Sequence, residues 1–291
     1  MFYGSIPALV TPFSGKCVDE DSLRNFIDWQ IEEGSNALVP CGTTGEAPTL
    51  SNPEQYRVFE IVVEQAKGRV PVIAGCGSSS TATCLEHLKA AKDAGADAAL
   101  VVTGYYNKPS QAGLLANFRA VAEASELPII VYNVPGRTIV DIKAETMAEI
   151  ARLPNIVGVK DATGDLGRVT AHRLLCGEKF YQLSGNDETA LGYNAMGGVG
   201  CISVSANVAP RLCAEFQAAT REGRWDDAIA LQDRLYPLHA ALFTDSSPGP
   251  TKYALSRVRP GFPTALRLPL TEPSDASKQA VDKALEHAGL I

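Results

Sequence analysis

The chain has 291 residues, of which 45% are hydrophobic and 20% are charged, and its formal net charge is -7. This composition excludes disordered, collagen-like and coiled-coil proteins, and the acidic balance argues against nucleic acid or an anionic membrane surface as a partner. A length about twice that of a typical domain leaves either two domains or one large α/β barrel.

The sequence shows none of the patterns of a membrane-spanning, secreted or metal-binding protein. No apolar stretch approaches the ~20 residues of a bilayer-spanning helix, and the first residues carry no basic leader. The seven cysteines form no Cys-x-x-Cys pair, and the four histidines are scattered without ligand spacing. We therefore expect a cytoplasmic protein in a reducing compartment, with no bound metal and no cofactor.

Short apolar runs rich in β-branched residues recur along the first three quarters of the chain. They do not alternate between polar and apolar residues, which is typical of strands buried on both faces. The eight runs, each predicted to be a strand, are Ser5–Val10, Ala37–Pro40, Val70–Ala74, Ala98–Val102, Ile129–Tyr132, Ile156–Val159, Phe180–Leu183 and Gly200–Val204.

Segments with helical periodicity lie between these runs. Ser51, Pro53 and Glu54 supply an N-cap, an early helical proline and a capping-box acid for one such helix. Successive runs begin roughly 20–33 residues apart, which is the length of one strand–loop–helix unit. Another predicted helix, Asp19–Glu33, places four apolar residues on one face: Leu23, Phe26, Ile27 and Ile31.

Eight such units in tandem predict an α/β fold, a closed (β/α)8 TIM barrel. The alternative is a doubly wound sheet, but the dinucleotide-binding fingerprint Gly-x-Gly-x-x-Gly is missing after every apolar run. The eighth helix is expected to end near Gly223. We therefore expect residues 1–223 to form the barrel that carries the active site, and residues 224–291 to add a C-terminal helical layer.

Lys160 stands out because active sites of such barrels lie at the C-terminal ends of the strands. It is the only one of eleven lysines that directly ends a buried apolar run. An ammonium in an apolar barrel mouth has its charged form disfavoured, which leaves a nucleophilic amine for Schiff-base formation with a carbonyl substrate. The alternative is a lysine that forms a salt bridge with Asp161 or another acid.

Other reactive side chains also follow the predicted strands. Tyr132 ends the neighbouring strand, where its hydroxyl can relay protons, although it can equally be a core tyrosine. Thr43 and Thr44 lie in a glycine-flanked loop that suits an anionic oxygen, a weak signal by itself. Arg137 follows a Pro-Gly turn and offers a fork for a carboxylate, unless it is a solvated surface arginine.

Four motifs together carry a family resemblance: GTTGE at 42–46, YYNKP at 105–109, YNVPGRT at 132–138 and GVKDATGD at 158–165. In this order, and after these strands, they resemble the dihydrodipicolinate synthase family, a branch of the N-acetylneuraminate lyase superfamily of Schiff-base aldolases. The resemblance runs from the first residue to the C-terminal helices. It implies a lyase that condenses pyruvate with L-aspartate 4-semialdehyde to 4-hydroxy-tetrahydrodipicolinate, in the diaminopimelate and lysine pathway.

The resemblance also implies roles for single residues. Lys160 would form the Schiff base with pyruvate, and Tyr132 would relay protons together with Thr43 and with Tyr106 from a neighbouring subunit. The expected partners are therefore small-molecule substrates and further copies of the chain, in a homotetramer built as a dimer of dimers with Tyr106 crossing the tight interface. The residues expected to bind substrate carboxylates are Thr44, with backbone support from Gly185 and Ile202, for pyruvate and Arg137 for aspartate semialdehyde.

The chain departs from the family pattern at two places. Gly104 replaces the usual proline before the tyrosine pair. In addition, the family's lysine-feedback site, which uses two histidines and a glutamate in many bacteria, is degenerate here, so we expect weak or absent inhibition by lysine. The corresponding residues are Ala47, Pro48, Asn52, Gln55, Ser79, Thr83 and Tyr105.

Three other functions remain open at this stage. A sugar-acid or keto-acid aldolase of the same superfamily would keep the Schiff base, but Arg137 argues against it. A non-enzymatic barrel that binds a keto acid would not need both Lys160 and Tyr132. A metal-dependent aldolase is disfavoured because no histidine follows a predicted strand.

Overall fold

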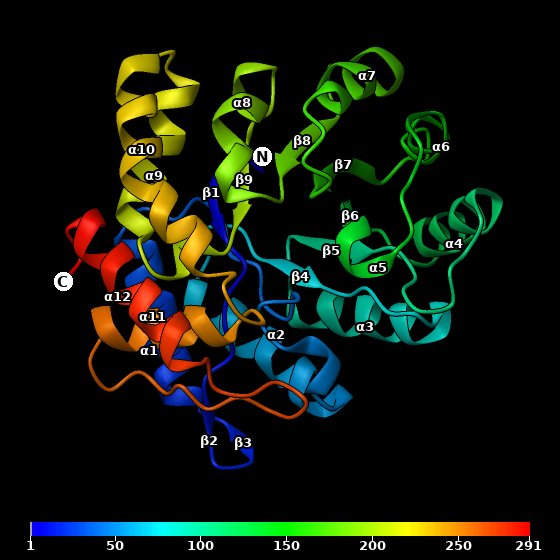
Figure 1. Cartoon of the computed structure of the whole chain (residues 1–291). Helices are drawn as coiled ribbons and strands as arrows, with labels where there is room; N and C mark the ends of the chain where they lie inside the picture. Colours follow the sequence, from blue (N-terminus) through cyan, green and yellow to red (C-terminus); the bar gives the residue numbers. More distant parts are fainter. Residues whose placement is uncertain (1) are drawn as a thin grey trace.

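The structure, a computed structural model, describes residues 2–291 and contains a curled parallel sheet enclosed by helices (Figure 1). Seven strands pair in the order β1-β9-β8-β7-β6-β5-β4, and every pair is parallel. The seven strands are β1 (Gly4–Pro7), β4 (Ile73–Gly75), β5 (Ala98–Val102), β6 (Ile129–Asn133), β7 (Ile156–Asp161), β8 (Tyr181–Ser184) and β9 (Gly200–Ser203).

The segment Ala37–Pro40 closes the gap between β1 and β4, although it is too short and irregular to count as a strand. Parallel bridges join its Val39 to Ala8 and its Leu38 to Val72. The hydrogen-bond ladder of this segment stops after these bridges because three residues next to the bridged positions are prolines, which lack an N–H group. They are Pro7, Pro40 and Pro71. The predicted (β/α)8 barrel is confirmed, with the second predicted strand present only as a pair of bridges.

Helices after the strands cover the outside of the barrel (Figure 1). The Ser51 N–H donates to the Glu54 carboxylate at 2.9 Å, so the predicted capping box is present. The helices of the barrel are α1 (Glu20–Glu32), α2 (Asn52–Ala66), α3 (Thr81–Ala94), α4 (Gln111–Ala124), α5 (Pro135–Thr138), α6 (Ala144–Ile150), α7 (Gly167–Cys176), α8 (Ala190–Ala195) and α9 (Pro210–Arg221). Short elements not predicted are the hairpin β2 (Phe13–Ser14) and β3 (Cys17–Val18) and the 3-10 turns η1 (Ala47–Thr49), η2 (Asp187–Thr189) and η3 (Ser205–Asn207).

Two apolar layers result from the alternation of side chains along each strand. On β6, Ile130 and Tyr132 belong to a buried cluster inside the barrel, whereas Val131 belongs to the larger cluster between sheet and helices. On β7, Val159 faces the helices. Lys160, the next residue, therefore points into the barrel interior.

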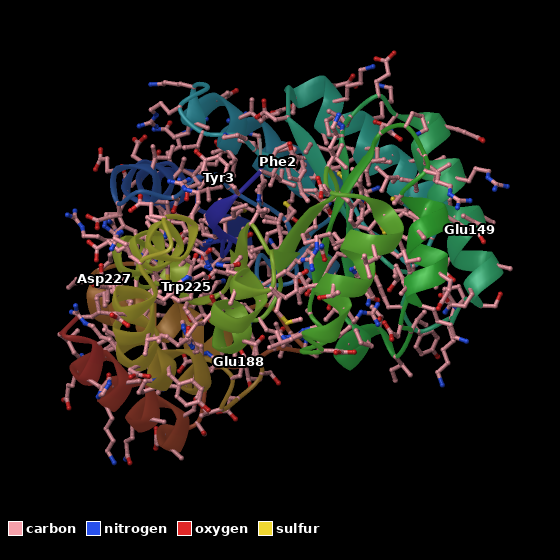
Figure 2. All side chains as sticks on the ribbon, turned by 90° about the horizontal axis from the view of Figure 1, so that it is seen from above. Phe2, Tyr3, Glu149, Glu188, Trp225 and Asp227 are labelled. Carbon is pink, nitrogen blue, oxygen red and sulfur yellow. The ribbon has the colours of Figure 1, made fainter. Side chains whose placement is uncertain are left out.

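Three further helices, α10 (Trp225–Ala241), α11 (Gly249–Val258) and α12 (Asp275–Ala288), pack on one side of the barrel (Figure 1). Figure 2, seen from above, places Trp225 of α10 on the side opposite Glu149 of α6. Buried apolar residues of all three helices, among them Leu238, Leu255 and Leu285, belong to the same cluster that fills the space between the sheet and its helices. Within residues 2–291 no helix combines the length and the hydropathy that a membrane crossing requires.

Candidate active site

Lys160 and Tyr132 lie side by side at the C-terminal ends of two paired strands. The register of β6 and β7 sets Tyr132 directly opposite Lys160, and both side chains are buried, Tyr132 at 7% and Lys160 at 6% exposed. The Lys160 Nζ atom lies 4.3 Å from the centroid of the Tyr132 ring. Lys160 forms no salt bridge with any residue between 2 and 291, whereas Asp161 pairs with Arg168 at 3.0 Å. The alternative interpretation of Lys160 as the partner of Asp161 is therefore wrong.

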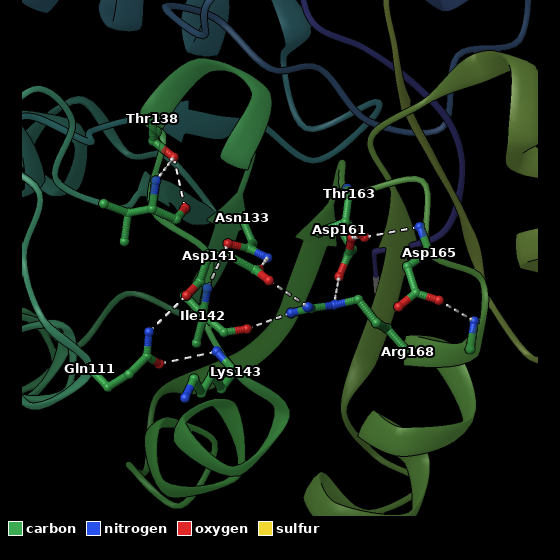
Figure 3. Close-up of polar contacts among 12 residues, drawn as sticks. Gln111, Asn133, Thr138, Asp141, Ile142, Lys143, Asp161, Thr163, Asp165 and Arg168 are labelled. Atoms are coloured by element: carbon green, nitrogen blue, oxygen red, sulfur yellow. Dashed lines mark hydrogen bonds and ion pairs between the residues drawn. The ribbon is translucent and has the colours of Figure 1, made fainter.

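A network of side chains fixes the ends of these two strands (Figure 3). Asn133, which follows Tyr132, donates to Asp141 at 2.7 Å and accepts from the Ile142 N–H at 3.1 Å. Arg168 of α7 joins the strands, because its guanidinium contacts both Asp161 and Asp141 at 3.0 Å. Each carboxylate is thus bound by donors from this network, which was not predicted.

The GTTGE loop follows the segment Ala37–Pro40 and forms a tight turn. The Gly45 N–H donates to the Gly42 carbonyl at 3.1 Å, and the Glu46 N–H donates to the Thr43 carbonyl at 3.1 Å. A Cβ atom at Gly45 would lie 3.0 Å from the Leu9 carbonyl oxygen, so the turn packs closely against the end of β1. Thr43 is half-buried at the barrel mouth.

A cavity of about 390 Å³ opens between this loop and the loops after β4, β5 and β6. Thr43, Tyr132 and Arg137 line it, so three of the predicted site residues meet there. Arg137 lies on α5, is exposed, and forms no salt bridge with residues 2–291. It is the only charged residue in the lining, which makes the cavity suitable for an anionic ligand.

The remaining predicted residues of the substrate site do not line this cavity. Lys160 lies against the Tyr132 ring, and Thr44 is buried. Ile202 lies on β9 in the apolar interior of the barrel. Gly185 follows β8, where a Cβ atom would lie 2.6 Å from the Ala162 Cβ atom, so a side chain does not fit.

Asp187, just after β8, holds the segment that follows Ile202. Its carboxylate accepts hydrogen bonds from the Val204 N–H at 2.9 Å and the Ser205 N–H at 3.1 Å. The Ser205 hydroxyl contacts His239 Nδ1 at 2.7 Å, so α10 supports the same segment from outside. Neither residue was assigned a role from the sequence, because Asp187 lies in a loop and His239 carries no local signal of this contact.

Tyr106 is not brought to the site within one chain. Its side chain is 96% exposed, and its backbone has a φ of 70°, in the left-handed region. Tyr105, in contrast, lines the cavity.

Most positions of the degenerate lysine site line the same cavity. His87, which sequence reasoning missed, contacts Asn52 at 3.2 Å and Gln55 at 3.4 Å. Burial lowers the pKa of His87, which favours its neutral form. No carboxylate lines the cavity, and Ser79 lies outside the lining. The other predicted positions, Ala47, Pro48, Asn52, Gln55, Thr83 and Tyr105, all line it.

Residues 2–291 contain no group of three or more histidine, cysteine, aspartate or glutamate side chains that could hold a metal ion.

Comparisons with known proteins identify the family of the chain. Residues 1–288 match the model of the dihydrodipicolinate synthetase family. The chain is 64% identical to the 4-hydroxy-tetrahydrodipicolinate synthase of Rhizorhabdus wittichii and 62% identical to that of Zymomonas mobilis subsp. mobilis, and each match covers 100% of both chains. A crystal structure of dihydrodipicolinate synthase from Acinetobacter baumannii complexed with pyruvate superposes with a TM-score of 0.97, at 45% identity over 100% of both chains. The chain belongs to the dihydrodipicolinate synthetase family.

Proposed function

We propose that the chain condenses pyruvate with L-aspartate 4-semialdehyde to 4-hydroxy-tetrahydrodipicolinate through a Schiff base on Lys160. The single observation that carries this mechanism is the buried amine of Lys160, without an acidic partner, beside the Tyr132 ring at the barrel mouth. The relatives that share about three fifths of the sequence carry the name of this activity. The product is a step toward diaminopimelate and lysine.

The Lys160 amine attacks the keto carbon of pyruvate, and loss of water from the resulting carbinolamine forms the imine. Removal of a methyl proton gives an enamine, whose carbon attacks the aldehyde of the second substrate. The amino group of that substrate then displaces Lys160 and closes the ring, which restores the free amine. Tyr132 relays the protons of these steps, together with Thr43 and the Tyr106 of a second copy.

The substrate carboxylates meet different groups. Thr44, with the backbone near Gly185 and Ile202, holds the carboxylate of pyruvate beside Lys160. Arg137 holds the carboxylate of aspartate semialdehyde, because its free guanidinium is the only charge that lines the cavity.

Trapping with borohydride tests the covalent step. Reduction of the protein in the presence of pyruvate should fix an adduct on Lys160, located by mass spectrometry of peptides, and the Lys160→Met variant should give none. Lys252, the other buried lysine, is an internal control because it lies outside the cavity. An adduct on Lys252, or no adduct on the wild-type protein, would refute the mechanism.

Arg137→Ala should raise the KM for aspartate semialdehyde by about 10-fold or more, which corresponds to the loss of a charge-assisted hydrogen bond. Borohydride trapping of pyruvate should be unchanged, since the first half of the reaction does not use this residue. A matched Arg137→Lys variant separates the charge from the forked geometry. Faster turnover of sialic or ketodeoxy acids than of aspartate semialdehyde by the wild type would instead favour the sugar-acid aldolase.

We propose that lysine inhibits this enzyme weakly or not at all. An ε-ammonium needs a carboxylate, and the part of the cavity around Asn52, Gln55 and His87 offers only amides and a neutral imidazole. Steady-state rates should therefore stay constant up to millimolar lysine. Inhibition at sub-millimolar lysine would contradict this expectation.

We propose a homotetramer, a dimer of dimers, in which Tyr106 completes the site of its tight-dimer partner. The exposure of Tyr106 supports this role. Co-expression of Lys160→Met with Tyr106→Phe chains tests it, because each hybrid dimer would contain one site with both native residues. Random mixing makes about half of the dimers hybrids, each with one native site out of two. Activity should therefore rise from the level of the single variants to about one quarter of the wild-type value. No gain over the Tyr106→Phe protein, in hybrids verified by tagged purification, would place Tyr106 outside the partner's site.

We also propose a boundary within the chain and a cellular location for the enzyme. The chain divides near Gly223 into the barrel 1–223, which carries the active site, and the helical layer 224–291. The enzyme works in the cytoplasm, which agrees with seven free cysteines, five of them buried. Cell fractionation that recovers it elsewhere would contradict this location.

A further inference from the structure

A fully buried ion pair links the helical layer to the GTTGE loop. The Lys252 ammonium on α11 donates to the Glu46 carboxylate at 2.6 Å, although the two residues are 206 positions apart in the sequence. Both side chains are 0% exposed. Glu46 is the last residue of the GTTGE motif, and neither the mechanism nor the cavity lining uses it.

Further polar contacts complete this pair. Lys252 Nζ also donates to the Ala265 carbonyl at 2.7 Å and lies 4.3 Å from the centroid of the Phe13 ring. The second carboxylate oxygen of Glu46 accepts a hydrogen bond from the backbone N–H of Arg267 at 3.0 Å. Burial lowers the pKa of Lys252, and the negative charge of Glu46 opposes this change. A pair of this kind gains little net stability over an apolar pair of the same shape, so its position requires another explanation.

The loop held by this pair has a strained backbone at both ends. Cys41, just before it, has a φ of 53°, and Glu46 has a φ of 57°, both in the left-handed region. For residues other than glycine such conformations are strained and persist only where the surroundings enforce them. Thr43 and Thr44 lie between these two residues. Fixing Glu46 from outside therefore fixes the conformation that presents the two threonines.

Arg267 holds the continuation of the loop. Its Nη1 atom donates to the Thr49 carbonyl at 2.9 Å and to the Glu54 carboxylate at 2.9 Å, and its Nη2 atom donates to the Lys16 carbonyl at 2.7 Å. The Arg267 guanidinium lowers the pKa of Glu54 to about 2. The turn η1 connects the GTTGE loop to α2. Lys252 contacts Glu46 just before this turn, and Arg267 contacts Thr49 at its end.

We propose that Glu46, Lys252 and Arg267 are positioning residues for pyruvate. Through the backbone of the loop they hold Thr43 and Thr44 where the pyruvate carboxylate binds, and they touch no substrate themselves. This inference rests on the proposed function, since it assigns the loop to pyruvate. Arg137 lies on a different element, α5, and makes no contact with this ion pair. The positioning residues should therefore affect the binding of pyruvate more than the binding of aspartate semialdehyde.

The double variant Glu46→Gln/Lys252→Met tests the proposal, because it removes both charges together and leaves no isolated buried charge. The pyruvate concentration that gives half-maximal borohydride trapping on Lys160 should rise by about 10-fold. The KM for aspartate semialdehyde should stay within about 2-fold of the wild type. A pair that serves stability alone would lower the melting temperature and leave the half-saturating pyruvate concentration unchanged.

Leu285→Ala is the matched control. Leu285 is fully buried on α12 of the same helical layer, and its truncation leaves a cavity in an element that supplies none of the loop contacts described above. This variant should lose thermal stability and trap pyruvate like the wild type. An equal rise in the half-saturating pyruvate concentration of this variant would overturn the proposal, because any destabilisation of the helical layer would then explain weaker pyruvate binding.

Arg267→Gln is the second variant, which decides the question if the double variant does not fold. Arg267 is partly exposed, so its loss leaves no fully buried charge. It should raise the half-saturating pyruvate concentration by about 3-fold. Wild-type binding of pyruvate by every folded variant, or failure of both variants to fold, contradicts the proposal. Absence of an adduct on Lys160 in the wild type refutes the proposed function instead.

Discussion

The parallel pairing of β6 and β7 is the constraint on which the site depends. Their register sets Tyr132 opposite Lys160, and the alternation along each strand turns both side chains into the barrel. A shift of either strand by one residue would send its reactive side chain toward the helices. The network of Asn133 and Asp161 with Arg168 holds this register at the strand ends, where the ladder stops.

Part of the support for the site comes from outside the barrel. The helical layer reaches the barrel mouth through His239, which contacts the segment after β9, and through Lys252 and Arg267, which contact the GTTGE loop and its continuation. Loops at the mouth of a barrel have few neighbours of their own, so they depend on such contacts to keep a defined geometry. The layer is therefore part of how the site is built, although none of its residues lines the cavity.

Features expressed by local sequence could be predicted, and features that depend on distant contacts could not. The barrel and the positions of Lys160 and Tyr132 follow from apolar runs and the residues that end them. The partner of Glu46 lies 206 residues away, and Lys252 sits in an ordinary amphipathic helix, so no local pattern connects them. His87 was missed for the same reason, because it lies in the middle of α3 and its partners, Asn52 and Gln55, lie on α2. The role of Tyr106 depends on a second copy of the chain.

The central claim is that Lys160 becomes covalently bound to pyruvate at the mouth of this barrel. A crystal structure of the protein soaked with pyruvate tests it most directly. The account predicts continuous electron density from Lys160 Nζ to the keto carbon, with the carboxylate against the Thr43–Thr44 loop and the Tyr132 hydroxyl within hydrogen-bond distance. Pyruvate bound without a covalent link, or density that joins it to another residue such as Lys252, would contradict the claim.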